Sequence, residues 1–179
     1  MAVVLIGFIY WQVRKSHIEI GPDQKIDITP EQIQSIKAIG EWEFMSISDE
    51  EMIDTIRRGI FSDDHLVRIY YGTLRLGVNL KQVEPGWITT RNDSIEMILP
   101  PIELLDRDFI DESRTKSFYE SGKWKSYDRE AMLKRAYQRM LQRSMTPQNM
   151  QIARENGEAQ VRQVLQGMGF KHIKIQYKD

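Results

Sequence analysis

The first residues of the chain form its most apolar segment. Residues 2–11 read AVVLIGFIYW without a charge, and the chain turns basic at Arg14 and Lys15. A helix of ten residues rises about 15 Å, roughly half of a bilayer core of about 30 Å. Two aromatic residues followed by bases are typical of a helix leaving a bilayer. We therefore predict a membrane anchor at residues 1–16, truncated at its start, and a linker at residues 17–27.

The same segment has a second interpretation, as a buried helix or strand of a soluble domain or as an element between subunits. By the positive-inside tendency, the bases after it would keep the domain in the cytoplasm if Met1 were the true start, whereas an upstream basic region would reverse that orientation. We favour membrane contact through residues 2–13 and an extracytoplasmic domain.

A helix start follows the linker. Thr29 is a capping residue, Pro30 suits the first helical position, and Gln32 completes a capping box. Gly40 stands where a left-handed residue ends a helix. The pattern predicts a helix between Pro30 and Gly40.

The apolar period changes to two after this helix, which indicates strands. Residues 49–58 fit a helical spacing nearly as well, and we interpret them as a strand. Gly72 and Gly77 indicate a bulge or a close backbone approach within a long strand. The predicted strands cover residues 42–47, 49–58, 66–78, 87–90 and 95–99.

The second half of the chain is predominantly helical in its pattern. Apolar residues recur three or four positions apart over residues 126–143. A second cap and proline, Thr146 and Pro147, begin another helix, inside which Gly157 indicates a close helix crossing or a break. Alternation over residues 172–177 predicts a last strand.

These elements predict one α+β domain over residues 28–179. Its mainly antiparallel sheet would carry an N-terminal helix and a C-terminal helix pair packed on it.

Composition excludes several classes of site. The chain has no cysteine, which removes disulfides, thiolate zinc sites and cysteine nucleophiles. A net charge of −1 argues against a general nucleic-acid binder. No cofactor motif or metal-ligand spacing is present, and the sequence predicts neither a cofactor nor a metal.

Charge is strongly segregated. Residues 41–64 hold eight acids against two bases, and residues 114–143 hold nine bases against three acids. The two segments could attract one another within the fold or between protomers. Arg135, Arg139 and Arg143 recur every four residues, and we place them along one helix side, opposite much of the apolar face. They are candidates for binding anionic lipid or an acidic protein, with a solvated helix face as the alternative.

Two further groups are candidate sites. Asp106, Asp108 and Asp111 could hold a cation or divide acid and base roles if they faced one cleft, although aspartates in such segments commonly cap turns. The aromatic group Phe118, Tyr119, Trp124 and Tyr127 could bind a partner or form a small core under a loop.

Three blocks carry a family resemblance. They are IYYGTLRLGVNL at residues 69–80, IEMILP at residues 95–100 and Ile110-Asp111, followed by LQGMG at residues 165–169. Together they resemble the domain of unknown function 4230 family of uncharacterised bacterial proteins. The resemblance implies a single N-terminal membrane segment and no established activity. Asn79 stands where the family often has Asp, which argues against an essential carboxylate there.

The sequence thus predicts a membrane-tethered domain of the cell envelope that acts as a binding or scaffolding module. The alternative is an envelope hydrolase that uses Asp106, Asp108 and Asp111.

Overall fold

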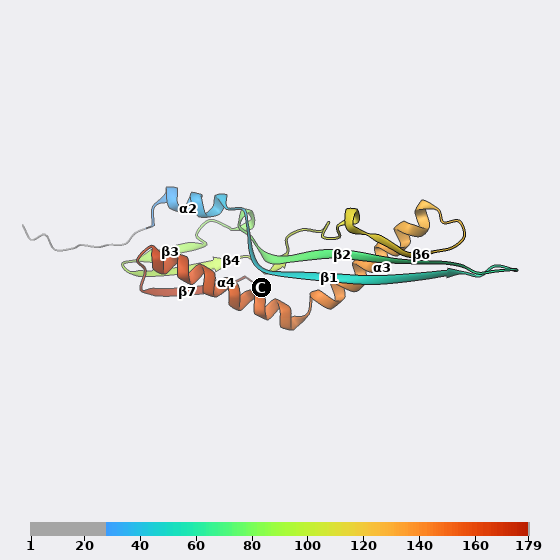
Figure 1. Cartoon of the computed structure of the whole chain (residues 1–179). Helices are drawn as coiled ribbons and strands as arrows, with labels where there is room; N and C mark the ends of the chain where they lie inside the picture. The colour runs from blue at the N-terminus through green and yellow to red at the C-terminus, as the bar shows by residue number, and fades with distance from the viewer. Residues whose placement is uncertain (1–27, 179) are drawn as a thin grey trace, which may run out of the picture.

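The computed structural model describes residues 28–178, so the predicted anchor and the predicted linker lie outside the described residues. The described part is elongated, with α2 at one end and a long β-hairpin at the other (Figure 1). In chain order the helices and strands are α2 (Pro30–Ala38), β1 (Glu41–Arg57), β2 (Asp64–Asn79), η1 (Leu80–Gln82), β3 (Ile88–Arg91), β4 (Ser94–Leu99), β5 (Glu103–Leu104), η2 (Glu112–Arg114), β6 (Lys116–Glu120), α3 (Ser126–Ser144), α4 (Pro147–Gly167) and β7 (His172–Tyr177).

The start of α2 confirms the predicted capping box. The Gln32 backbone N–H donates to Thr29 Oγ1 at 3.2 Å, and the Thr29 N–H donates to Gln32 Oε1 at 2.8 Å. Gly40 follows the helix with a φ of 76°, which side chains with a Cβ rarely adopt. Local chemistry alone therefore sets both ends of α2.

The strands form two sheets. In the first, β1 pairs with β2, and the other edge of β2 pairs with β5 and β6. In the second, β3 and β4 are antiparallel, and β7 lies parallel to β4. The α+β class and the mainly antiparallel pairing are confirmed, and so is the strand assigned to residues 49–58, of which residues 49–57 are part of β1.

A large apolar core lies at the α2 end. Side chains from α4 meet the second sheet and the nearby ends of β1 and β2 there. Gly157 lets α4 approach Phe44 and Tyr177, because a Cβ at this glycine would lie 2.6 Å from Tyr177 Oη and overlap the Phe44 ring. The helix runs unbroken through Gly157, so the close approach is to strands and does not interrupt the helix.

A smaller core lies between α3 and the hairpin. Ile53 and Tyr70 pack there against Met132, Ala136 and Met140 of α3. The glycines of β2 also confirm the predicted close approach: a Cβ at Gly72 would lie 3.1 Å from the Phe109 ring, and one at Gly77 would overlap the Trp42 carbonyl.

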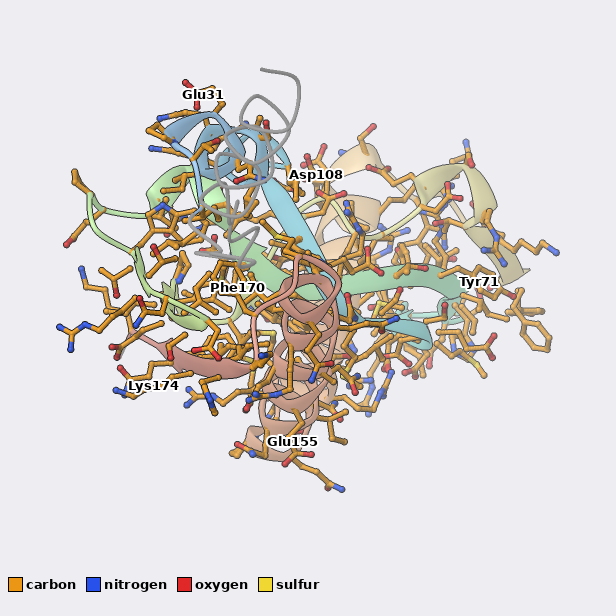
Figure 2. All side chains as sticks on the ribbon, turned by 90° about the vertical axis from the view of Figure 1, so that its left-hand side faces the viewer. Glu31, Tyr71, Asp108, Glu155, Phe170 and Lys174 are labelled. Carbon is orange, nitrogen blue, oxygen red and sulfur yellow. The ribbon has the colours of Figure 1, made fainter. Side chains whose placement is uncertain are left out.

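The segment with the candidate aspartates and helix α4 lie on different sides of the β1 and β2 ribbon. Seen from the α2 end, Asp108 and Glu155 lie on opposite sides of the β1 and β2 ribbon (Figure 2). The segment with the candidate aspartates therefore occupies a different side of the molecule from α4.

Candidate functional site on the hairpin arm

Strands β1 and β2 form an arm that extends beyond the rest of the described chain (Figure 1). Their antiparallel register runs from Glu41 opposite Asn79 to Arg57 opposite Asp64. At about 3.3 Å per residue, β1 is roughly 53 Å long. The residues left over at the turn, 58–63, form the tip of the arm.

The predicted arginine row contacts β1 of this arm. Arg139 Nη1 lies 2.9 Å from Glu51 Oε1, and Arg143 Nη1 lies 2.9 Å from Glu51 Oε2. Arg143 also donates to both carboxylate oxygens of Asp49 at 2.8 Å. Arg135 Nη1 donates to Thr55 Oγ1 at 3.0 Å. We call these contacts the arginine clamp.

The position of the row on α3 differs from the sequence expectation. Arg135 and Arg139 each precede a buried residue, Ala136 and Met140, so the row flanks the apolar face and is not opposite to it. Successive helical residues are about 100° apart, which turns such neighbours toward the same packed strand. The acidic and basic segments consequently attract one another within the fold.

The clamp governs the ionisation of Glu51. This side chain is only 9% exposed, and burial alone would raise the pKa of its carboxyl. Hydrogen bonds and charge from Arg139 and Arg143 outweigh burial and hold the pKa of Glu51 below its ordinary value. Glu51 therefore stays ionised and holds α3 against β1.

Main-chain carbonyls of β1 are also bound by helix side chains. Arg135 Nη1 donates to the Asp54 carbonyl at 3.1 Å, and Arg143 Nη2 donates to the Glu50 carbonyl at 3.2 Å. Asn156 of α4 donates to the Phe44 carbonyl at 3.3 Å. Among the described residues β1 has one strand neighbour only, β2. These bonds occupy acceptors that an edge strand would otherwise offer to another chain.

The tip of the arm exposes two large apolar side chains. Ile60 is 94% exposed and Phe61 is 99% exposed. Farther along β1, Met52 and Ile56 are each 55% exposed. Ile60 and Phe61 were not among the predicted site residues. An apolar pair between two arginines and two aspartates, in what the pattern indicates is a turn, was nevertheless a usable signal.

Contacts at its base hold the tip in place. Arg57 Nη2 lies 2.7 Å from Asp64 Oδ2, and the Arg57 guanidinium lies 4.6 Å from the centre of the Trp124 ring. Within the tip, the Gly59 N–H donates to Asp63 Oδ1 at 3.1 Å. The apolar pair therefore extends from a loop that is tied to β2 and to the segment before α3.

The aromatic group is divided by the structure. Trp124 packs against the core under the arm, and its Nε1 donates to the Ser121 carbonyl at 2.7 Å. Phe118, Tyr119 and Tyr127 are 70%, 52% and 59% exposed. Trp124 thus supports the base of the tip, while its aromatic neighbours face outward.

The three candidate aspartates line one open hollow of about 480 Å³. Asp106 Oδ1 accepts the Asp108 backbone N–H at 2.8 Å, and Asp111 Oδ1 accepts the Ser113 hydroxyl at 2.5 Å. The Ser113 hydroxyl bond holds the pKa of Asp111 below its ordinary value. Within residues 28–178 no group of three or more histidine, aspartate or glutamate side chains is placed to hold a metal ion.

Comparison with known proteins identifies a family. The sequence model of DUF4230, described as a protein of unknown function, matches residues 34–175. The chain belongs to this family. The match covers α3, α4 and nearly all of the sheet residues, so the hairpin arm and its clamp lie within the DUF4230 region.

Two other comparisons add no relative. No curated protein and no solved structure matches this DUF4230 chain. None of the helices between residues 28 and 178 has the length and apolar composition to cross a bilayer.

Proposed function

We propose that this DUF4230 chain is a membrane-tethered binding module of the cell envelope. Residues 2–13 hold it to the membrane, and the hairpin arm presents the tip to a partner on the extracytoplasmic side. The observation that carries the binding role is the near-complete exposure of Ile60 and Phe61 at the end of a clamped arm.

The arrangement of the arm supports a binding role over a purely structural one. Two adjacent apolar side chains at an apex contribute nothing to either core, and their exposure to water is unfavourable. Exposed apolar groups of this kind commonly mark interaction sites when they are grouped. The tip combines them with exposed aromatic residues at its base, which are the side chains that dominate binding hot spots.

A hydrolase based on the three aspartates has weaker support. Asp106 and Asp111 accept hydrogen bonds from residues two positions later, which is the geometry of turn capping. A general acid in such a site would need a raised pKa, whereas the pKa of Asp111 is lowered. The carboxylates therefore suit the local fold better than proton transfer.

The tether is tested by fractionation of cells that produce the full chain or a chain without residues 2–13. We expect the full chain in the membrane fraction and the shortened chain outside it. A full chain recovered wholly in the soluble fraction would contradict the tether. A reporter that is active only outside the cytoplasm, fused to the C-terminus, tests the orientation.

The binding role is tested by photo-crosslinking in cells. A photoreactive amino acid replaces Phe61 in the full chain, and the control replaces Ile39, which is 53% exposed next to α2 at the other end of the molecule. We expect crosslinks from position 61 that position 39 does not give. Equal yields at both positions, or none at either, would contradict a binding role for the tip.

A further inference from the structure

The shape and exposure of the tip restrict what it can bind. The tip, residues 58–63 with Ile60 and Phe61, is the end of the arm, which extends past α3 and β6 (Figure 1). A projecting apolar pair needs a partner that can receive it, either a deep pocket in a protein or the interior of a lipid leaflet. The charges and rings around the tip decide between these partners.

Several bases without ion pairs lie at the tip and along the arm behind it. Segments 57–64 and 116–125 hold five bases and three acids. Asp64 pairs with Arg57, and Glu120 pairs with Arg129. The remaining charges in these segments are four bases and one acid: Arg58, Lys116, Lys123, Lys125 and Asp63. None of these five forms an ion pair within residues 28–178. The surface behind the apolar pair is therefore positive, which complements an anionic surface.

The second segment lies against the arm immediately behind the tip. The Ser121 N–H donates to the His65 carbonyl at 2.8 Å, and Arg57 donates to the Lys123 carbonyl. In β6, Tyr119 lies opposite Val67 and its ring is 5.7 Å from that of His65. The bases and exposed rings thus form a collar along the arm behind the tip, from Lys123 beside Arg57 to Lys116 opposite Ile69.

This combination of side chains is typical of a membrane interface. Apolar groups enter the hydrocarbon, aromatic rings occupy the headgroup level, and lysine and arginine meet the phosphates. The exposed rings of the collar are Phe118, Tyr119 and Tyr127. A protein pocket would explain the apex alone, whereas a lipid surface explains the apex, the rings and the bases together.

We propose that the tip inserts Ile60 and Phe61 into an anionic lipid bilayer, with the basic and aromatic collar resting on its headgroups. This inference rests on the proposed function, in which the tip is the binding end. The tip and α2 lie at opposite ends of the elongated described part (Figure 1).

The test uses a single fluorescent label, which the absence of native cysteine makes specific. Phe61→Cys in the full chain carries a polarity-sensitive dye, and Ile39→Cys is the matched control. The chain is held in phosphatidylcholine nanodiscs through residues 2–13, and vesicles with about 30 mol% phosphatidylglycerol are added. Vesicles of phosphatidylcholine alone are the lipid control. If the chain does not enter nanodiscs, the same titration is made with the free chain.

We expect a blue shift and a fluorescence gain of roughly threefold or more at position 61 with anionic vesicles, and no change at position 39. Reversing Arg58→Glu and Lys123→Glu together should weaken vesicle binding by roughly tenfold or more, because each charge acts directly on an anionic surface.

Three results would overturn the lipid proposal: no change at position 61, an equal change with neutral vesicles, or an equal change at both labelled positions. If position 61 still crosslinks to a protein in cells, the tip remains a binding end and only the lipid assignment fails. If position 61 neither crosslinks nor responds to vesicles, both proposals fail.

Discussion

The core at the α2 end is built from apolar side chains, whereas the core under the arm is smaller and is bordered by paired charges. Of the two buried polar side chains of the described chain, Glu51 lies on the arm and Ser144 at the end of α3. The α2 end excludes water by packing α4 on two sheets. The arm is held by one helix face together with the arginine clamp.

The two cores therefore have different roles. The core at the α2 end stabilises the domain, and the core under the arm holds the tip in position. A large core can anchor an arm, but a two-stranded hairpin is marginally stable by itself and needs a packed helix to keep its direction. The clamp fixes the position of β1 against α3 without adding apolar surface. Among the described residues, it leaves the outward face of the arm and the tip uncovered. We expect changes at the α2 end to alter global stability and changes at the arm to act locally.

The largest effect is expected from Gly157→Leu at the α2 end. The new side chain would overlap the Phe44 ring and Tyr177 Oη, and overpacking of this kind destabilises by about 3 kcal/mol or more. Urea denaturation measures the change. Gly167→Leu in the same helix is the control, because a Cβ there meets nothing within 4 Å. Equal stability of the two variants would show that α4 is not tightly packed at Gly157.

A smaller effect is expected when the clamp is removed. Arg139→Met with Arg143→Met leaves the buried Glu51 carboxylate without its partners, which costs about 2–3 kcal/mol. Hydrogen exchange should quicken at residues 50–55 and stay unchanged at residues 95–99. Lys134→Met, an exposed change on α3, should remain within about 0.5 kcal/mol. Uniform loss of protection in both regions would contradict the separation of the two cores.

Acid should weaken the arm through Glu51. Its carboxyl pKa is lowered in the folded chain from 4.5, so the unfolded chain binds this proton more readily. The stabilisation by Glu51 is thus full above about pH 5 and is lost as the pH falls through the folded pKa. Denaturation at a series of pH values should show a shallower acid loss for Glu51→Gln. Identical slopes for the two chains would show that the clamp does not depend on this charge.

The features that could be predicted from the sequence are those set by residues close together along the chain. The Thr29 and Gln32 capping box and the end of α2 at Gly40 are set by local bonds, and all appear as expected. The arginine row was recognised from its spacing, but its partners on β1 depend on how α3 packs across the arm. No helical or strand period reveals contacts between residues about 90 positions apart.

Other features gave no readable pattern. All five residues of β6 are exposed, so no alternation of buried and exposed positions marks this strand. In β1, Met52 and Ile56 point outward while Ile53 is buried, which explains why residues 49–58 fitted two periods. The tip was missed for a related reason, because burial patterns report cores and Ile60 and Phe61 belong to neither.

The smallest effect on stability is expected at the tip. Ile60→Ser with Phe61→Ser should change the free energy of unfolding by no more than about 0.5 kcal/mol, because neither side chain is packed. Thermal and urea unfolding measure this. A loss of about 2 kcal/mol or more, similar to that expected for the clamp variant, is typical of a deletion in a core. It would mean that Ile60 and Phe61 pack inside the chain.

The central claim, that the tip is occupied by a partner, is tested most directly by cysteine accessibility in cells. Phe61→Cys and Ile39→Cys are each treated with a small uncharged thiol reagent, in cells and as purified full chain in neutral nanodiscs. We expect position 61 to react roughly tenfold more slowly, or slower still, in cells than in the purified chain, because a bound partner excludes water from a hot spot. Position 39 should react at the same rate in both. Equal reactivity of position 61 in cells and in purified protein would contradict the account.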